Sequence, residues 1–172
     1  MKDIALAKNL LNDEKKAIVI VKDGEVIFSS KDKGIKPVCA ALNEFKDELQ
    51  GSSVADKVIG KAAAMIYKHA DIKELSTKLI SERAVDVLKN TSIVYDYEKL
   101  VPYIKNRDQS GLCPIETLSL QTDNIDELLL KISNFLEKER TREKFSLSKQ
   151  ENSVHGSDSK ESTEREIKIW FE

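Results

Sequence analysis

Residues 51–66 read Gly-Ser-Ser-Val-Ala-Asp-Lys-Val-Ile-Gly-Lys-Ala-Ala-Ala-Met-Ile, and they carry most of the prediction of fold and function. Gly51 is suited to end a preceding element, and Ser52 or Ser53 is a good N-cap, so the stretch predicts a helix over residues 54–69. Unpaired backbone amides, two hydroxyls and the positive end of the helix dipole would then meet at one place. Such a place favours an anionic or phosphate-bearing ligand. The run of alanines would also let the helix lie close to a sheet.

The segments around this stretch alternate between strand and helix patterns. The pattern predicts an α/β domain with three layers, in which helices cover both faces of a mixed sheet. An Asp-Gly turn between two apolar runs predicts a hairpin. The expected helices are 4–11, 38–49, 84–88 and 124–136, and the expected strands are 17–21, 26–28, 75–80, 93–97 and a short edge strand at 118–120.

Composition limits the class of protein. A chain of 172 residues with 40% hydrophobic and 34% charged residues is expected to form one domain, which we place at residues 1–140. Residues 141–172 are rich in Ser, Glu, Lys and Gln, so we expect a disordered polar tail with a short apolar end. A net charge of −2 and a pI of about 5.9 argue against a nucleic-acid partner.

Location and redox state follow from two absences in the sequence. Neither a signal peptide nor a long apolar run is visible, so we expect no membrane partner. Two cysteines are too few for a disulfide framework. We therefore expect a cytoplasmic protein with reduced thiols.

An ordered series of short motifs resembles a known family. The motifs are Ile-Val-Ile-Val-Lys-Asp-Gly at 18–24, Gly-Ile-Lys-Pro at 34–37, the stretch at 51–64, Leu-Val-Pro-Tyr-Ile at 100–104, Asn-Arg-Asp at 106–108 and Gly-Leu-Cys-Pro-Ile-Glu at 111–116. They resemble a prokaryotic family of uncharacterised proteins whose fold is similar to cytidine deaminase. The resemblance covers about residues 1–138. It implies a cytidine deaminase-like sheet, with a site where helix N-termini approach one another.

The zinc motifs of true deaminases are missing from this chain. Those enzymes hold zinc with a His or Cys on one helix and a Pro-Cys-x-x-Cys at the start of the next. Here residues 51–66 contain neither His nor Cys, and Ser81-Glu82-Arg83-Ala84 stands where the paired cysteines would be expected. We therefore expect no metal, no other cofactor and no zinc-dependent deamination.

Two polar clusters supply the candidate ligand-binding residues. In the first, Lys57 and Lys61 are four residues apart and would share a helix face beside the two serines. In the second, Asn106 could recognise an amide or a ribose hydroxyl, and Arg107 could form paired bonds to a carboxylate or phosphate. Each cluster has a purely structural alternative, a solvated helix face or an Arg–Asp pair in a turn. The predicted ligand-binding set is Ser52, Ser53, Lys57, Lys61, Asn106 and Arg107.

Three functions compete on these residues. The leading hypothesis is a domain that binds a nucleotide or a related phosphorylated small molecule at a helix N-terminus. The second is a metal-independent transferase or hydrolase acting on a nucleotide-like substrate, with Cys113 or Glu116 working beside Asp56. The third is an interaction module that recruits a partner through residues 141–172. An edge strand and exposed helices would also permit a homodimer.

Overall fold

The computed structural model describes residues 2–151, with side-chain burial described through residue 146. The prediction about the tail beyond residue 151 lies outside the described residues. The elements, in chain order, are α1 (Asp3–Asp13), β1 (Ile18–Lys22), β2 (Glu25–Ser30), α2 (Lys36–Glu44), α3 (Lys46–Leu49), β3 (Ser53–Ile59), α4 (Lys61–His69), β4 (Glu74–Ser81), α5 (Glu82–Leu88), β5 (Val94–Val101), α6 (Pro114–Ser119) and α7 (Ile125–Glu151).

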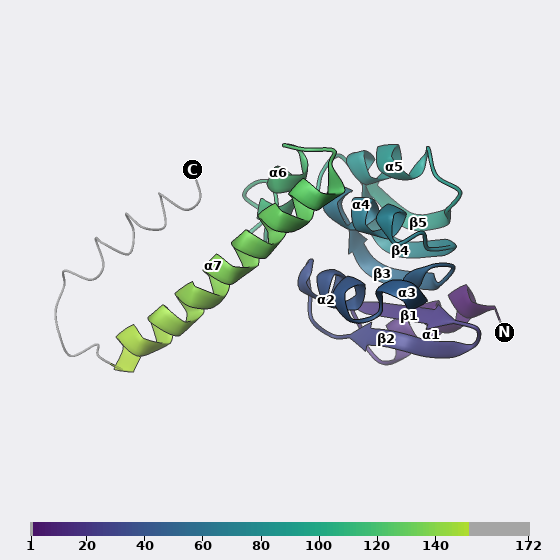
Figure 1. Cartoon of the computed structure of the whole chain (residues 1–172), viewed down its shortest axis with the longest axis horizontal. Coiled ribbons are helices and arrows are strands. Elements are labelled where there is room, and N and C mark those ends of the chain that lie inside the picture. Colours follow the sequence, from purple (N-terminus) through teal and green to yellow (C-terminus); the bar gives the residue numbers. More distant parts are fainter. Residues whose placement is uncertain (1, 152–172) are drawn as a thin grey trace. The chain divides into compact units, whose positions relative to one another are not determined.

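Five strands form one mixed sheet in the order β2-β1-β3-β4-β5 (Figure 1). β1 pairs antiparallel with β2 and with β3, whereas β3, β4 and β5 run parallel. The hairpin between β1 and β2 turns through Asp23 and Gly24, both with positive φ, as a tight two-residue turn requires. The predicted α/β architecture with a mixed sheet is therefore confirmed.

Helices lie on both faces of this sheet. Neighbouring residues of β3 show this, because successive side chains of a strand point to opposite faces. Ala55 packs in a buried cluster with Ala7 and Leu11 of α1. Asp56 instead accepts a hydrogen bond from Tyr67 of α4. α5 packs beside α4, so these two helices share the face opposite α1.

The predicted helix over residues 54–69 is wrong in its first half. Residues 53–59 form β3, and the helix α4 begins only after Gly60. The β-branched residues in this segment suit a strand, and pairing with both β1 and β4 satisfies the backbone groups that a helix would have paired internally. Gly51 has a φ of 73°, and it forms the turn into the strand.

The C-terminal third also differs from expectation. The predicted edge strand at 118–120 is wrong, because residues 114–119 form α6. Pro114 is the first residue of this helix, a position that favours proline. α7 continues to Glu151, so residues 141–151, which composition assigned to the tail, are helical. The chain divides into two compact units between Ile132 and Ser133, within α7, and the sheet belongs to the first.

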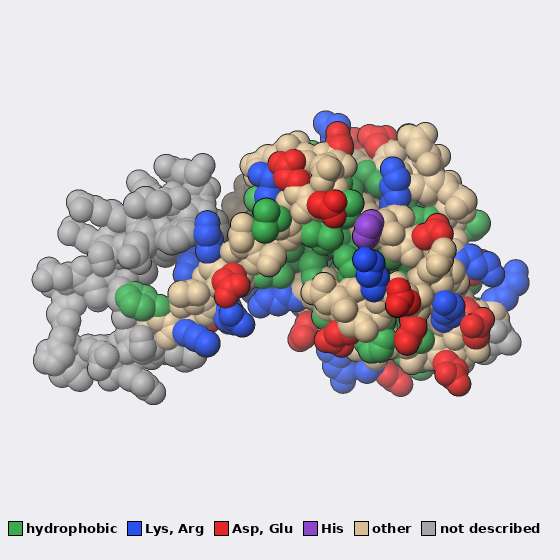
Figure 2. Space-filling view, viewed as in Figure 1, with side chains coloured by type: hydrophobic (Ala, Val, Ile, Leu, Met, Phe, Trp, Pro, Cys, Tyr) green, Lys and Arg blue, Asp and Glu red, His purple; other side chains and the backbone are tan. Residues whose placement is uncertain are grey.

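The surface of the sheet-containing unit is of mixed charge on the face shown in Figure 2. Acidic and basic side chains are intermingled there, with small hydrophobic areas between them. Among the helices that the structure describes, none combines the length and apolar character needed to cross a membrane.

Candidate functional site

Two helix N-termini meet the same edge of the sheet. α4 begins after Gly60 and follows β3 immediately in the chain. α5 begins after Ser81 and follows β4 in the same way. Since β3 and β4 pair in parallel up to Ile59 and Ile80, both helices start at the carboxyl ends of neighbouring strands. This edge is where open α/β sheets bind ligands. We therefore built the candidate site from the residues found there.

The carboxyl group of Glu116 lies against both helix starts. Glu116 is in the first turn of α6, and its Oε1 accepts hydrogen bonds from the Lys61 amide and the Ser81 hydroxyl, each at 3.4 Å. Its Oε2 has no hydrogen-bond partner among the described residues, although the side chain is only 2% exposed. Ser81 also caps α5, since its Oγ accepts the Ala84 amide at 3.2 Å. A carboxyl group of the protein itself thus fills the position where a helix N-terminus favours an anion.

Gly60 is needed for this close approach. A Cβ added to Gly60 would overlap Oε2 of Glu116 and would lie 3.2 Å from Cγ1 of Ile104. The φ of Gly60 is −95°, which any residue adopts, so backbone freedom is not the reason for the glycine. The absence of a side chain at Gly60 therefore determines how deeply the Glu116 carboxyl group is buried.

The Glu116 carboxyl group is poorly satisfied in this position. Burial raises its pKa above the ordinary value of 4.5, while interactions with the backbone amides of Lys61 and Ile104, the bond from Ser81 and the charge of Lys61 oppose that rise. Hydrogen bonds of 3.4 Å are longer than the usual range of about 2.7–3.2 Å. The site therefore holds its internal carboxylate weakly.

Lys61 provides the positive charge nearest to this carboxyl group. Its Nζ forms an ion pair with Asp123 at 2.8 Å and donates to the Thr122 carbonyl at 3.4 Å. The Lys61 side chain is 12% exposed and that of Asp123 is 94% exposed, so Asp123 is the partner in contact with solvent. The ion pair with Lys61 lowers the pKa of the Asp123 carboxyl. A ligand could take over the Lys61 ammonium by displacing an exposed carboxylate.

The loop after β5 closes over the site through Ile104. Asn106 braces this loop, because its Oδ1 accepts the amides of Ser110 and Gly111 and its Nδ2 donates to the Ser110 hydroxyl. The predicted role of Asn106 in reading a ligand therefore competes with a structural one. Arg107 is exposed and forms no hydrogen bond or ion pair with another residue in the described part of the chain.

Three other predicted binding residues lie elsewhere. Ser52 and Ser53 cap no helix, because the chain there enters β3, so the dipole argument for an anion at these serines fails. Ser53 instead donates to Glu74 at 3.1 Å, and the buried Ser52 hydroxyl has no partner among the described residues. Lys57 lies on β3, so the helical spacing that would join it to Lys61 does not exist.

The structure does not assemble the predicted catalytic group. Asp56 accepts the Tyr67 hydroxyl at 2.7 Å between β3 and α4, whereas Glu116 bonds to the starts of α4 and α5. The two carboxylates thus belong to separate hydrogen-bond networks. Cys113 is the half-buried residue that precedes α6, and its backbone amide donates to Ile104.

Metal ligands do not gather in the described part of the chain. Within residues 2–151, no group of three or more His, Cys, Asp or Glu side chains is arranged to hold a metal ion. The side chains that meet at this edge of the sheet are instead a serine and a glutamate, Ser81 and Glu116.

The chain belongs to the DUF1893 family of domains of unknown function, whose sequence pattern matches residues 6–136. This confirms the resemblance to an uncharacterised family. A crystal structure of a DUF1893 family protein from Thermotoga maritima is 29% identical, with a TM-score of 0.71 over 78% of this chain and 90% of that one. The family match contains every residue of the candidate site.

Two further similarities concern proteins with named activities. A protein from a Nocardioides species described as a nucleoside diphosphate kinase is 31% identical over 117 residues, which are 65% of this chain and 86% of that protein. The nucleoside diphosphate kinase family pattern also matches residues 131–172. RibD of Acinetobacter baumannii is 17% identical over 70% of this chain and 38% of that one, with a TM-score of 0.42, which establishes no shared fold.

Sequence reasoning missed one similarity outside the site and one feature of the site itself. It treated residues 131–172 mainly as the end of a helix and a polar tail, and composition contains no sign of the kinase similarity. It also placed the helix N-terminus at the serines instead of at Gly60. The signal that could have corrected this is the change at Gly60 from β-branched residues to a run of alanines.

Proposed function

We propose that this domain binds a nucleotide or a related phosphorylated small molecule at the carboxyl edge of β3 and β4. The phosphate would take the place of the Glu116 carboxylate at the start of α4. The observation that carries the proposal is the internal carboxyl group itself, which is held at the starts of α4 and α5 by two hydrogen bonds of 3.4 Å. Because both hydrogen bonds are long, we expect a stronger acceptor to displace this carboxyl group.

A phosphate would satisfy the donors at this edge of the sheet better than the Glu116 carboxyl group does. It offers more acceptor oxygens and more charge than a carboxylate, and helix N-termini bind phosphate through free backbone amides. The Lys61 amide and the Ser81 hydroxyl are the donors that Glu116 would release. Lys61 would exchange Asp123 for the ligand, and the exposed Arg107 could form paired bonds to a second phosphate.

Two considerations favour a nucleotide over other phosphorylated molecules. The Nocardioides relative is described as a nucleoside diphosphate kinase, so its name points to nucleoside diphosphates as ligands. The predicted cytidine deaminase-like arrangement, which remains part of this proposal, would also place a nucleoside at converging helix starts. Ile104 and Glu116 both lie against Gly60, so we expect the loop that contains Ile104 to move when a ligand binds.

Titration calorimetry with ADP, and separately with inorganic phosphate, tests the proposal. Glu116→Ala removes the internal competitor, so we expect ADP to bind about tenfold more tightly or better, since a like charge at this range costs on the order of 1–4 kcal/mol. Lys61→Met should weaken binding. Glu44→Gln, an exposed change on α2, is the matched control and should change nothing.

The proposal fails if ADP and phosphate bind neither the wild-type chain nor Glu116→Ala while circular dichroism shows that both are folded. It also fails if Lys61→Met leaves the affinity of Glu116→Ala for ADP unchanged.

A further inference from the structure

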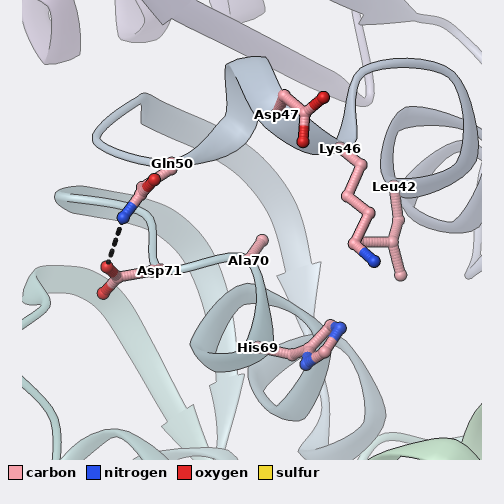
Figure 3. A pocket seen from close by; sticks show the side chains of 7 residues that line it. All are labelled: Leu42, Lys46, Asp47, Gln50, His69, Ala70 and Asp71. Carbon is pink, nitrogen blue, oxygen red and sulfur yellow. Dashed lines mark hydrogen bonds between the residues drawn. The ribbon is translucent and has the colours of Figure 1, made fainter.

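A hollow of about 310 Å³ lies between the α2–α3 segment and the C-terminal end of α4 (Figure 3). It lies at the opposite end of α4 from Glu116, so it is separate from the site proposed above. Leu42 and Ala70 contribute apolar surface, and both are largely buried. The polar side chains that line it are Lys46, Asp47, Gln50, His69 and Asp71.

Polar side chains surround the hollow, and its two acidic residues lie apart. Figure 3 shows Gln50 and Asp71 on one side and Lys46 and His69 on the other, with Asp47 beside Lys46 on α3. Nε2 of Gln50 donates to Oδ2 of Asp71 at 3.3 Å, and the Gly51 amide donates to the Asp71 carbonyl at 2.9 Å. These bonds tie Asp71 to residues 50–51, which come from a different segment of the chain.

The charged groups are not used by the protein itself. The side chains of Lys46, Asp47 and His69 form no hydrogen bond or ion pair with another residue among those described. Asp71 keeps one carboxylate oxygen outside its bond with Gln50. The C-terminal end of α4 also directs the negative end of its dipole toward this region, which favours a positive group. Two opposite charges are therefore available across one small hollow.

We propose that this hollow binds a small zwitterion, an amino acid or a dipeptide. Lys46 would bind the carboxylate, and Asp71 would bind the ammonium group. The apolar side chain would cover Leu42 and Ala70. A volume of about 310 Å³ is near the lower end of small-molecule sites, which are about 300–1,000 Å³, and it therefore suits a compact ligand better than a dinucleotide.

The test is a titration of the full chain with leucine and with glycylleucine, followed by the backbone amide signals of Gly51 and Ala70 in NMR spectra. Leucinamide lacks the carboxylate, and N-acetylleucine lacks the ammonium group. We expect saturable shifts with leucine or glycylleucine. Each single-charge analogue of leucine should bind about tenfold more weakly than leucine, the effect expected for one charge-assisted hydrogen bond.

Two variants assign the charges to their partners. Lys46→Met should weaken leucine binding about tenfold and leave leucinamide binding unchanged. Asp71→Asn should weaken leucine binding equally and leave N-acetylleucine binding unchanged. Asn suits the φ of 54° at Asp71, so this variant keeps the turn. Glu48→Gln and Lys68→Met are matched controls, because both positions are exposed and neither lines the hollow.

The proposal is overturned if leucine and glycylleucine cause no saturable shift in the folded chain. It is also overturned if Lys46→Met weakens leucine and leucinamide binding equally, or if a control variant has as large an effect. Because ADP is absent from these titrations, failure here leaves the nucleotide proposal unaffected.

Discussion

Replacing Asp56 by asparagine should stabilise the protein at neutral pH. Asp56 lies on β3 with 7% exposure, where Oδ2 accepts the Tyr67 hydroxyl at 2.7 Å and Oδ1 accepts the Val58 amide at 3.2 Å. Burial nevertheless raises the pKa of Asp56 from 3.8 to about 6, against the opposing effect of these bonds. The negative charge is therefore less stable in the folded protein than in the unfolded chain.

The magnitude follows from the two pKa values. The interval from 3.8 to about 6 corresponds to about 3 kcal/mol, at about 1.4 kcal/mol for each pKa unit. Within this interval the folded protein binds more protons than the unfolded chain, so the contribution of Asp56 to stability falls as the pH rises. The loss is complete above pH 6 or so. Asparagine does not ionise, so the unfolding free energy of the variant does not fall in this way as the pH rises.

Urea unfolding followed by circular dichroism at pH 4 and at pH 7 measures this effect. In Asp56→Asn the side-chain NH2 group, a donor, would replace one of the two accepting oxygens and would face the Tyr67 hydroxyl or the Val58 amide. We allow about 1 kcal/mol for this change of hydrogen bonding. Since the carboxyl of the unfolded chain is already largely ionised at pH 4, the stability of Asp56→Asn relative to wild type should then rise by about 2 kcal/mol between the two pH values. Asp13→Asn, at an exposed position on α1, is the matched control.

The reasoning is refuted if the difference in unfolding free energy between Asp56→Asn and wild type is the same at both pH values. A difference that shrinks as the pH rises would show that the charged form is favoured by folding, which is the opposite sign.

The remaining predictions concern the contacts of the buried polar groups. Gly60→Ala should lower the unfolding free energy by about 1–3 kcal/mol, because its Cβ overlaps Glu116. In a Glu116→Ala background the same change should cost much less, and equal costs in the two backgrounds would contradict the contact. Ser81→Ala should cost about 1 kcal/mol through loss of the α5 cap, measured by urea unfolding, and no loss would argue against the cap. Tyr67→Phe should destabilise the chain by about 1–3 kcal/mol at pH 7 and by less at pH 4, where Asp56 is protonated; a cost independent of pH would contradict the assignment.

The strongly patterned parts of the fold could be predicted from the sequence. The unbroken apolar run at 17–21 predicted a central strand, and residues 18–21 are buried in β1 between two neighbouring strands. The Asp-Gly turn predicted the hairpin, and the helix predicted at 84–88 lies within α5. In each case the physical cause is local, since neighbouring residues decide a turn, a cap or the period of burial.

The sequence by itself therefore determined an α/β domain with a mixed sheet, and it indicated a helix N-terminus close to residues 51–66. Only the tertiary structure decided that residues 53–59 are a strand, because that choice depends on hydrogen bonds to β1 and β4. It also decided that Glu116 lies at the start of α4. Lys61 and Glu116 are 55 residues apart in the chain. A local sequence pattern does not indicate which distant side chain will lie at a helix end after folding.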